Sequence, residues 1–395
     1  MRFVVVLGVV CAAATAAADA PRADEASGIA VAAPIDSHPV ANAFLFVPRE
    51  LVVLALSVPR VAAEGVDAYL TARSPNLYAR DTHSSWRAGG EVAWETRLGP
   101  SLALRLGYEL APGVALDAYG GAFGPRGESG GAIVSLGNFG GVAPRIRFDT
   151  GRDLSRTVAI EDGPRMDYHA RGWAVTAAVP ARFGAFVGAA SAGVDSSRAD
   201  GDELAAMRGA DEREHALTAE LAIGIDTRRP AAPYIAAAEP SRGTLVRAAA
   251  AYVRGDATDS GDFATGRFTL EAKQLLDVFH GDRVLTIGAW AQALSSADVP
   301  FDRLPALGGP DRMRAFARDE LRARTAAAAE LEYAWPLGNE SRAYVFVEGG
   351  AIASVLRADG GGGVRFVAGP TTWLRLQVAG ASTGDVGFLV MLGAL

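Results

Sequence analysis

The sequence predicts an all-β protein, a transmembrane antiparallel β-barrel of about 16 strands. From about Trp86 onward, apolar and polar residues alternate in segments of roughly ten residues separated by turn residues, a pattern typical of barrel strands. A soluble β-sandwich would show the same alternation, but the segments are too many for one sandwich. The polar positions also combine Arg with Glu, as expected for the wet interior of a barrel.

Composition agrees with a protein that has lipid on one face and water on the other. Of its 395 residues, 50% are hydrophobic and 21% are charged, and 46 are glycine. The formal net charge of −7 argues against a nucleic-acid partner, because phosphates select a basic surface. We expect membrane lipids as the main partner of the outer face.

The N-terminus has the features of a secretory signal peptide over residues 1–18. One basic residue precedes an apolar run, and Ala16–Ala18 forms a small-residue cleavage site before Asp19. Lipid attachment at Cys11 is the alternative, although Val10 is large for that processing site. The longest apolar run after the signal, Leu51–Val58, is far shorter than the roughly 20 residues of a membrane-spanning helix.

Residues 19–34 are Ala-rich, acidic and aperiodic, which predicts a disordered linker, and residues 35–85 form a different, helical segment. Pro48 and Pro59 each suit a helix start, so we expect short apolar helices near Arg49–Val58 and Arg60–Leu70. They would form a periplasmic cap, a plug in the lumen or an amphipathic helix at the membrane surface. A free linker is less favoured, because so much apolar surface would not remain in water.

The barrel is predicted over residues 86–395. About seventeen segments carry the alternation, and an even number is expected, so one of them should be wrong. The segments are Trp86–Arg97, Leu102–Leu110, 113–121, 129–138, 143–150, 154–162, 168–180, 182–191, His215–Ile225, 241–254, Arg267–Lys273, 282–294, Thr325–Leu337, Arg342–Gly350, 360–369, 371–380 and 384–394. Ser196–Arg213 is polar and predicts an extracellular loop, and Gly360–Gly363 predicts a turn that opens a strand.

The stretch Leu304–Gly350 carries the most specific pattern. A Gly/Pro-rich, charged loop that contains Arg314 precedes two predicted strands. Because side chains alternate across a strand, Glu332 falls on the polar face of the first strand and Glu348 on that of the second.

Three motifs in this stretch resemble those of one family. Leu307-Gly308-Gly309 followed by Met313-Arg314-Ala315-Phe316 resembles the GG…(V/L)RGF loop of the outer-membrane assembly barrels, the BamA/TamA-type (bacterial surface antigen) superfamily. Glu332–Leu337 resembles its EYR-x-PL strand, and Phe346–Gly350 resembles its FxDxG strand. Order and spacing agree, and a weaker likeness covers Asp226–Leu395. Ala315, Ala334 and Glu348 depart from the family pattern of Gly, Arg and Asp.

The resemblance implies a protein that inserts or translocates protein clients at the outer membrane of a Gram-negative-type bacterium. It also implies first and last strands that pair poorly and can open laterally. Most members carry periplasmic POTRA modules, but residues 19–85 do not follow the POTRA pattern, so we expect a monomeric, POTRA-less member. The alternative is a passive or structural barrel, a channel plugged by its own segments.

The resemblance also implies a loop folded into the lumen and held there. Arg offers a planar fork that can bind two carboxylates, so Arg314 would bridge Glu332 and Glu348. Phe316 and Phe346 would pack beside this pair, and Gly308 and Gly309 would belong to the same loop. The alternative is a solvated Arg314, because the surrounding sequence is charged throughout. Ala315 would cost about 1 kcal/mol if the loop required a positive φ there.

Enzymatic interpretations find little support, and no cofactor or metal site is predicted. The five histidines lack HxxxH or HExxH spacing, and no GxSxG motif occurs. A lipase that uses Ser155 and His169 on the outer wall is the remaining alternative. It is disfavoured because neither residue has a recognisable orienting partner in the sequence.

Overall fold

The computed structural model describes residues 86–394, apart from 96–98, 112–113, 123–126, 138, 205–206, 229–239, 279–282, 297, 338–340 and 369–370. The predicted signal peptide, linker and helical segment, and with them the absence of POTRA modules, lie outside the described residues. Within these residues no helix is long and apolar enough to cross a membrane.

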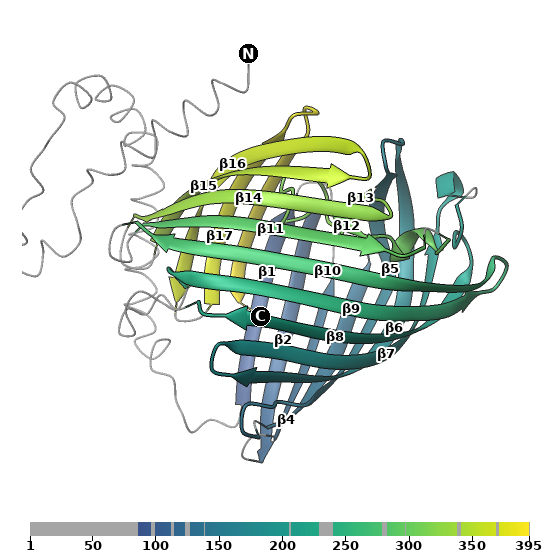
Figure 1. Ribbon diagram of the computed structural model, residues 1–395, viewed down its shortest axis with the longest axis horizontal. Coiled ribbons are helices and arrows are strands. Elements are labelled where there is room, and N and C mark those ends of the chain that lie inside the picture. Colours follow the sequence, from purple (N-terminus) through teal and green to yellow (C-terminus); the bar gives the residue numbers. More distant parts are fainter. Residues whose placement is uncertain are drawn as a thin grey trace, which may run out of the picture.

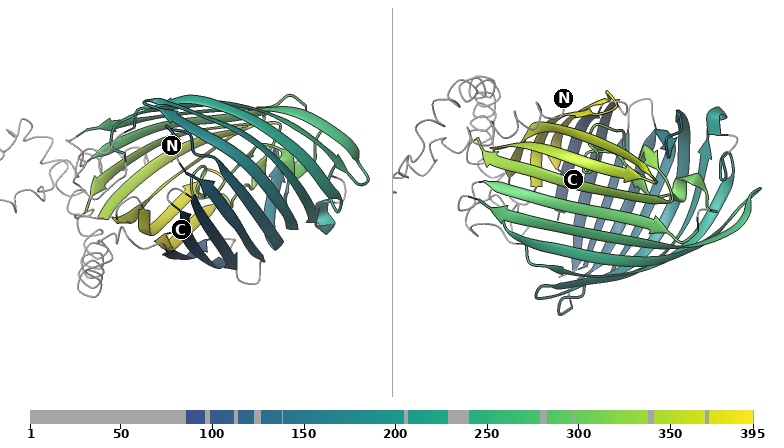
Figure 2. Two further views of the ribbon diagram at one scale, coloured as in Figure 1. Left: turned by 90° about the horizontal axis from the view of Figure 1, so that it is seen from below. Right: turned by 45° about the horizontal axis from the view of Figure 1, so that its top comes forward.

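The described chain forms one closed antiparallel barrel (Figures 1 and 2). The sheet has 18 strands, and 16 remain when the two-residue strands β12 (Ala306–Leu307) and β13 (Leu321–Arg322) are set aside. Each long strand pairs with its neighbour along the chain, and β1 pairs with β18 to close the sheet. The all-β barrel predicted from the sequence is therefore confirmed.

The long strands vary between nine and 19 residues. Their bounds are β1 Trp86–Glu95, β2 Gly99–Ala111, β3 Val114–Ala122, β4 Glu128–Leu136, β5 Arg145–Ile160, β6 Arg165–Phe183, β7 Phe186–Asp200, β8 Arg213–Asp226, β9 Gly243–Ala257, β10 Gly261–Asp277, β11 Val284–Leu294, β14 Thr325–Pro336, β15 Ser341–Ile352, β16 Val355–Ala368, β17 Thr371–Ala381 and β18 Val386–Ala394.

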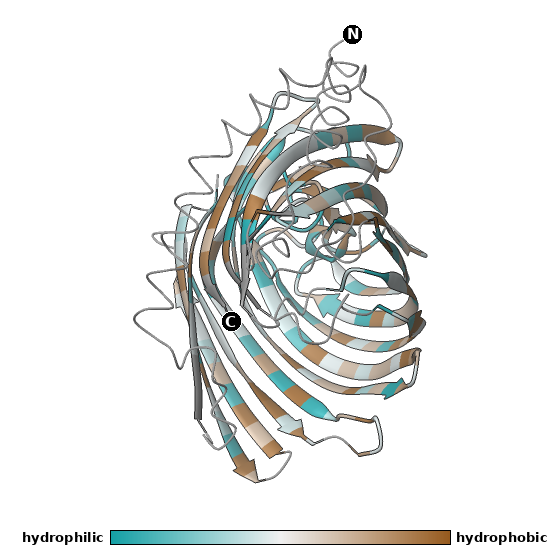
Figure 3. Cartoon of the chain, turned by 90° about the vertical axis from the view of Figure 1, so that its left-hand side faces the viewer, coloured by the Kyte–Doolittle hydropathy of each residue, from teal (hydrophilic) through white to brown (hydrophobic). Residues whose placement is uncertain are grey.

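Alternation along the strands divides the barrel into two faces (Figure 3). On β2, Leu102, Leu104 and Leu106 are 48%, 56% and 57% exposed, whereas Arg105 between them pairs with Asp117 of β3. Apolar side chains thus stay exposed on the outside, and paired charges lie inside. This is the arrangement expected when hydrocarbon surrounds the barrel and water fills it.

Two predicted segments, 143–150 and 154–162, are one strand. β5 runs through both, and a bulge shifts its register against β6 between Gly151 and Leu154. Asp153 lies inside the bulge with a φ of 51°. A bulge inserts unpaired residues and so breaks the alternation, which made one strand resemble two.

Two further predictions are wrong in part. The first five residues of the predicted loop Ser196–Arg213 belong to β7, and a short 3-10 helix, η4 (Asp202–Leu204), follows. The run Gly360–Gly363 is not a turn but lies in the middle of β16. A Cβ on Gly363 would stand 2.7 Å from Cζ of Tyr344, so the glycine makes room for an aromatic ring on the neighbouring strand.

Candidate functional site

The chain between β11 and β14, residues 295–324, is called here the connecting segment. It contains the 3-10 helix η5 (Phe301–Arg303), β12 and β13. Leu321 of β13 pairs in parallel with Ala159 of β5, and the backbone N–H of Ala159 donates to the carbonyl of Glu320 at 2.7 Å. Because β5 is far from β11 and β14 in the strand order, the segment reaches across the barrel to a distant strand.

Gly308 and Gly309 form the tight turn that starts the loop. Their φ values are 116° and 113°, and a Cβ on Gly308 would lie 2.1 Å from the carbonyl oxygen of Ala317. The N–H of Gly309 donates to the carbonyl of Phe316 at 3.1 Å. Both glycines are therefore required by the backbone, and the turn brings Phe316 back beside its own start.

The guanidinium of Arg314 lies among three glutamates of β14 and β15. Nη1 donates to Glu332 at 2.7 Å and Nη2 donates to Glu330 at 3.2 Å. Nε forms an ion pair with Glu348 at 2.9 Å. The side chain of Arg314 is 5% exposed, so it is a buried cation and not a solvated loop charge.

Aromatic rings and further cations surround this cluster. The Arg314 guanidinium lies 4.1 Å from the ring centroid of Phe346, close enough for a cation–π interaction. Phe316 and Phe346 are 2% and 1% exposed and belong to one apolar cluster. Arg365 of β16 donates to Glu332 at 2.9 Å, and Lys273 of β10 pairs with Glu330 at 2.8 Å. All seven residues expected at the site thus lie in one region.

The loop backbone is also bound by carboxylates. The N–H of Arg314 donates to Glu348 at 3.0 Å, and the N–H of Ala315 donates to Asp359 at 2.8 Å. Met313 and Asp319, not Ala315, adopt positive φ in this loop. The conformational cost considered for Ala315 therefore does not arise.

Arg314 stays charged in this environment. Burial alone would favour the neutral form, but Glu348 and Glu332 raise the pKa of Arg314 above its ordinary value. A permanent cation between carboxylates can hold two strands and a loop together, because each carboxylate would otherwise be buried without a countercharge.

A second arginine joins the connecting segment to the other side of the barrel. Arg303 of η5 pairs with Asp195 of β7 and lies 3.3 Å from Glu214 of β8. Burial disfavours its charge, but Asp302 and Asp195 raise the pKa of Arg303 above its ordinary value. Glu320 pairs in turn with Arg165 of β6, which also contacts Asp385 at 2.7 Å.

Arg303 and Glu320 were not predicted as site residues from the sequence, and neither were Glu330, Arg365, Lys273 and Asp359. Glu330 has the same strand parity as Glu332, which could have revealed it. Arg303 and Asp195 are far apart in the chain, so no local pattern connects them.

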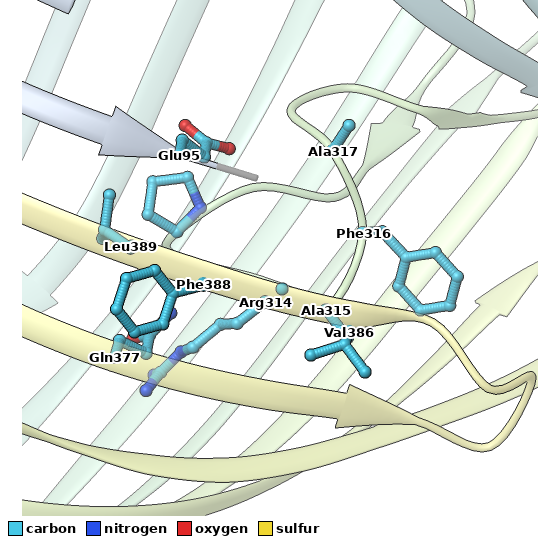
Figure 4. A pocket seen from close by; sticks show the side chains of 11 residues that line it. Glu95, Arg314, Ala315, Phe316, Ala317, Gln377, Val386, Phe388 and Leu389 are labelled. Atoms are coloured by element: carbon cyan, nitrogen blue, oxygen red, sulfur yellow. The ribbon is translucent and has the colours of Figure 1, made fainter. Parts of the chain in front are cut away.

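The loop also packs against the strands that close the barrel. Figure 4 shows Arg314 to Ala317 beside Val386, Phe388 and Leu389 of β18, with Glu95 at the end of β1. A Cβ on Gly387 would stand 2.4 Å from the carbonyl oxygen of Arg314. The cavity that remains here is about 10 Å³, room for about one water. Gly387 thus permits close contact between loop and seam.

Ser155 and His169 lie directly opposite each other on β5 and β6. In the described part of the chain, no hydrogen bond joins their side chains. Asp200 lies opposite His169 on β7, but its carboxylate is engaged by Arg198 and Arg171. The outer wall therefore brings the two residues together without the hydrogen bonds that would activate a serine.

No protein-family profile matches the sequence, and no curated protein matches it. Among solved structures, BamA from Haemophilus ducreyi lacking POTRA domains 1–3 aligns with a TM-score of 0.56 and 13% identity, over 79% of this chain and 70% of that one. This chain has the fold of the BamA-type barrels. CdiB from Acinetobacter baumannii and CdiB from Escherichia coli each align with a TM-score of 0.54, at 10% and 14% identity. These two alignments cover 78% of this chain and 60% and 63% of the CdiB chains, less than two thirds of their length.

Proposed function

We propose that this BamA-type barrel resides in the outer membrane of a Gram-negative-type bacterium and inserts or translocates protein clients. The observation that carries the proposal is the buried cluster of Arg314 with Glu332 and Glu348. It occupies the positions of three motifs that resemble the assembly barrels, on a fold similar to BamA and CdiB.

We further infer that the connecting segment occupies the lumen. Its anchors, Arg314, Arg303 and Glu320, bind strands on different sides of one closed sheet, and only the interior is within reach of all three. In this interpretation the cluster of Arg314, Phe316, Glu332, Phe346 and Glu348 locks the loop beside the seam. The loop would support β1 and β18 while client strands enter.

The seam offers a direct test. β1 and β18 pair over six residues, from Gly90 to Glu95, whereas β1 pairs with β2 over ten. Ala93 faces Met391 across the seam, so cysteines at both positions should form a disulfide that locks it. We expect the lock to stop client insertion in reconstituted membranes and a reductant to restore it. Each single cysteine variant serves as a control.

A passive, plugged barrel is the second candidate, and the three anchors of the connecting segment favour it. An anchored segment would close the pore whether or not clients pass. Absence of client insertion in reconstituted membranes by the wild type as well as by the locked variant, together with no co-purifying client, would establish the passive role.

We propose no catalytic function. The exposed His169 lies in register between Ser155 and Asp200, but the Asp200 carboxylate already binds two guanidiniums. Purified protein should therefore release no fatty acid from phospholipid vesicles. Hydrolysis that Ser155→Ala abolishes would refute this.

A further inference from the structure

Four adjacent strands each carry one arginine on the outer face of the barrel. These residues, called here the outer arginine row, are Arg152 of β5, Arg171 of β6, Arg198 of β7 and Arg213 of β8. Arg171 is the direct register partner of Arg198, and Arg198 is that of Arg213. Arg152 lies beside Arg171, at the bulge of β5. Adjacent strands are about 4.8 Å apart, so the guanidiniums form a continuous row.

The row lies just beyond the apolar band of the outer face. Trp173, two residues from Arg171 and on the same face, is 43% exposed. Val194 and Leu217, each four residues from an arginine of the row, are 45% and 52% exposed. At about 3.3 Å per residue, the arginines are about 7–13 Å from these apolar side chains along the strands. Exposed Trp marks the boundary between hydrocarbon and head groups, so the row is at the level of lipid head groups.

Carboxylates neutralise only part of the row. Asp200 pairs with Arg198 and lies 3.2 Å from Arg171, and Asp153 lies 3.5 Å from Arg152. The side chain of Arg213 is exposed and, in the described chain, has no ion-pair partner. Further carboxylates lie near the row: Glu128 is the register partner of Arg152, and Asp211 is close enough to Arg198 to interact with its charge. Asp167 and Asp256 lie on the same face, opposite Thr157 and His215.

Like charges directly opposite each other on neighbouring strands are destabilising. Arg198 and Arg213 are in this arrangement, and Asp200 is engaged on the other side of Arg198. An anion supplied from outside the chain would relieve the repulsion. Phosphate suits such a site, since the planar guanidinium binds phosphate oxygens in bidentate fashion.

We propose that the outer arginine row binds the phosphate groups of anionic lipid head groups. The proposal rests on the membrane location proposed above. A lipid is the occupant that matches both features, because its phosphate meets the arginines while its acyl chains cover Trp173, Val194 and Leu217. A soluble anion would leave the apolar band unused.

The test uses the full chain in nanodiscs of phosphatidylcholine, with phosphatidic acid as the anionic probe. Native mass spectrometry measures how much phosphatidic acid stays bound when the protein leaves the bilayer. One variant combines Arg171→Gln, Arg198→Gln and Arg213→Gln. The matched control is Arg247→Gln, which removes an exposed arginine from the inner face of β9.

Each arginine removed from the row should lower the relative affinity for phosphatidic acid about fivefold. Salt should weaken binding to the wild type, because exposed charges are screened. The Arg247 control should bind as the wild type does. Equal retention by the wild type and the triple variant would overturn the proposal. If inorganic phosphate were retained by the wild type as well as phosphatidic acid is, the assignment of the row to lipid would be overturned.

A second readout separates this proposal from the proposed function. Wild-type protein in pure phosphatidylcholine should migrate on gels as a folded, heat-modifiable barrel. Failure to fold there would contradict the membrane barrel itself. Normal folding without a preference for phosphatidic acid would contradict only the proposal that the outer arginine row binds lipid phosphate groups.

Discussion

Replacing Arg314 by methionine should destabilise the barrel in a way that identifies the glutamate most dependent on it. The Arg314 side chain is 5% exposed and lies within 3.2 Å of carboxylates from Glu330, Glu332 and Glu348. Removing one partner of a buried charge pair costs about 3–5 kcal/mol, because the other charge stays buried. We expect Arg314→Met to lower the free energy of unfolding by an amount in that range, measured by guanidinium denaturation of the protein in lipid vesicles.

Removal of Arg314 should not carry the same energetic cost at each of the three glutamates. Glu332 keeps Arg365, and Glu330 keeps Lys273. Glu348 has no other ion pair in the described chain and lies directly opposite Asp359, a second buried carboxylate. Adding Glu348→Gln to Arg314→Met should therefore recover most of the lost stability, whereas adding Glu332→Gln should recover little.

A double-mutant cycle measures this difference. Unfolding free energies are compared for the wild type, the single variants and the two double variants. A coupling energy with Glu348 larger than that with Glu332 is expected. Equal couplings near zero would mean that Arg314 is solvated in solution, and the proposed lock would be refuted.

Three further outcomes are expected. Arg303→Met should also lower the free energy of unfolding, by about 3–5 kcal/mol. It should expose the connecting segment near residue 303 to protease, while the chain around Arg314 stays resistant to cleavage. An unchanged digestion pattern would contradict a second anchor. Gly387→Ala should lower heat resistance on gels because its Cβ meets the Arg314 carbonyl at 2.4 Å, whereas Gly380→Ala, with no atom within 4 Å, should not; equal mobility of both variants would rule out this contact. Burial disfavours the charge of Arg314, but Glu348 and Glu332 raise its pKa above the ordinary value. Its contribution to stability is therefore fully present at any pH below the pKa of the unfolded arginine, and the stability difference caused by Arg314→Met should stay constant from neutral pH to about pH 10. A loss of this difference within that window would show deprotonation of Arg314.

The sequence was sufficient for the barrel because alternation is a local property. The outward face of β2 can be identified from the alternation of Leu102, Leu104 and Leu106 alone, because this pattern does not depend on which strands are its neighbours. The bulge at Gly151–Leu154 shifts the alternation, so β5 was divided in two. Ser196–Asp200 is polar except for Ala199, because β7 continues beyond the apolar band, and such a strand end cannot be distinguished from a loop by hydropathy.

Only those site residues that lie in a family motif, or that share the strand alternation of such a residue, could be predicted from the sequence. Arg314, Glu332 and Glu348 lie close together in the chain and carry the family resemblance. Arg303 meets Asp195 and Glu214 only because the barrel closes and the connecting segment crosses it. Pairings of that kind depend on the register of distant strands, which one sequence does not contain.

The most direct test of the account is a disulfide between the connecting segment and the far wall. Leu321 is the register partner of Ala159 on β5, and their side chains are 2% and 3% exposed. Cysteines at both positions should cross-link under mild oxidation in intact membranes. If no cross-link forms and the cysteine at position 321 reacts freely with a bulky, impermeant maleimide, the segment lies outside the barrel and the account is wrong.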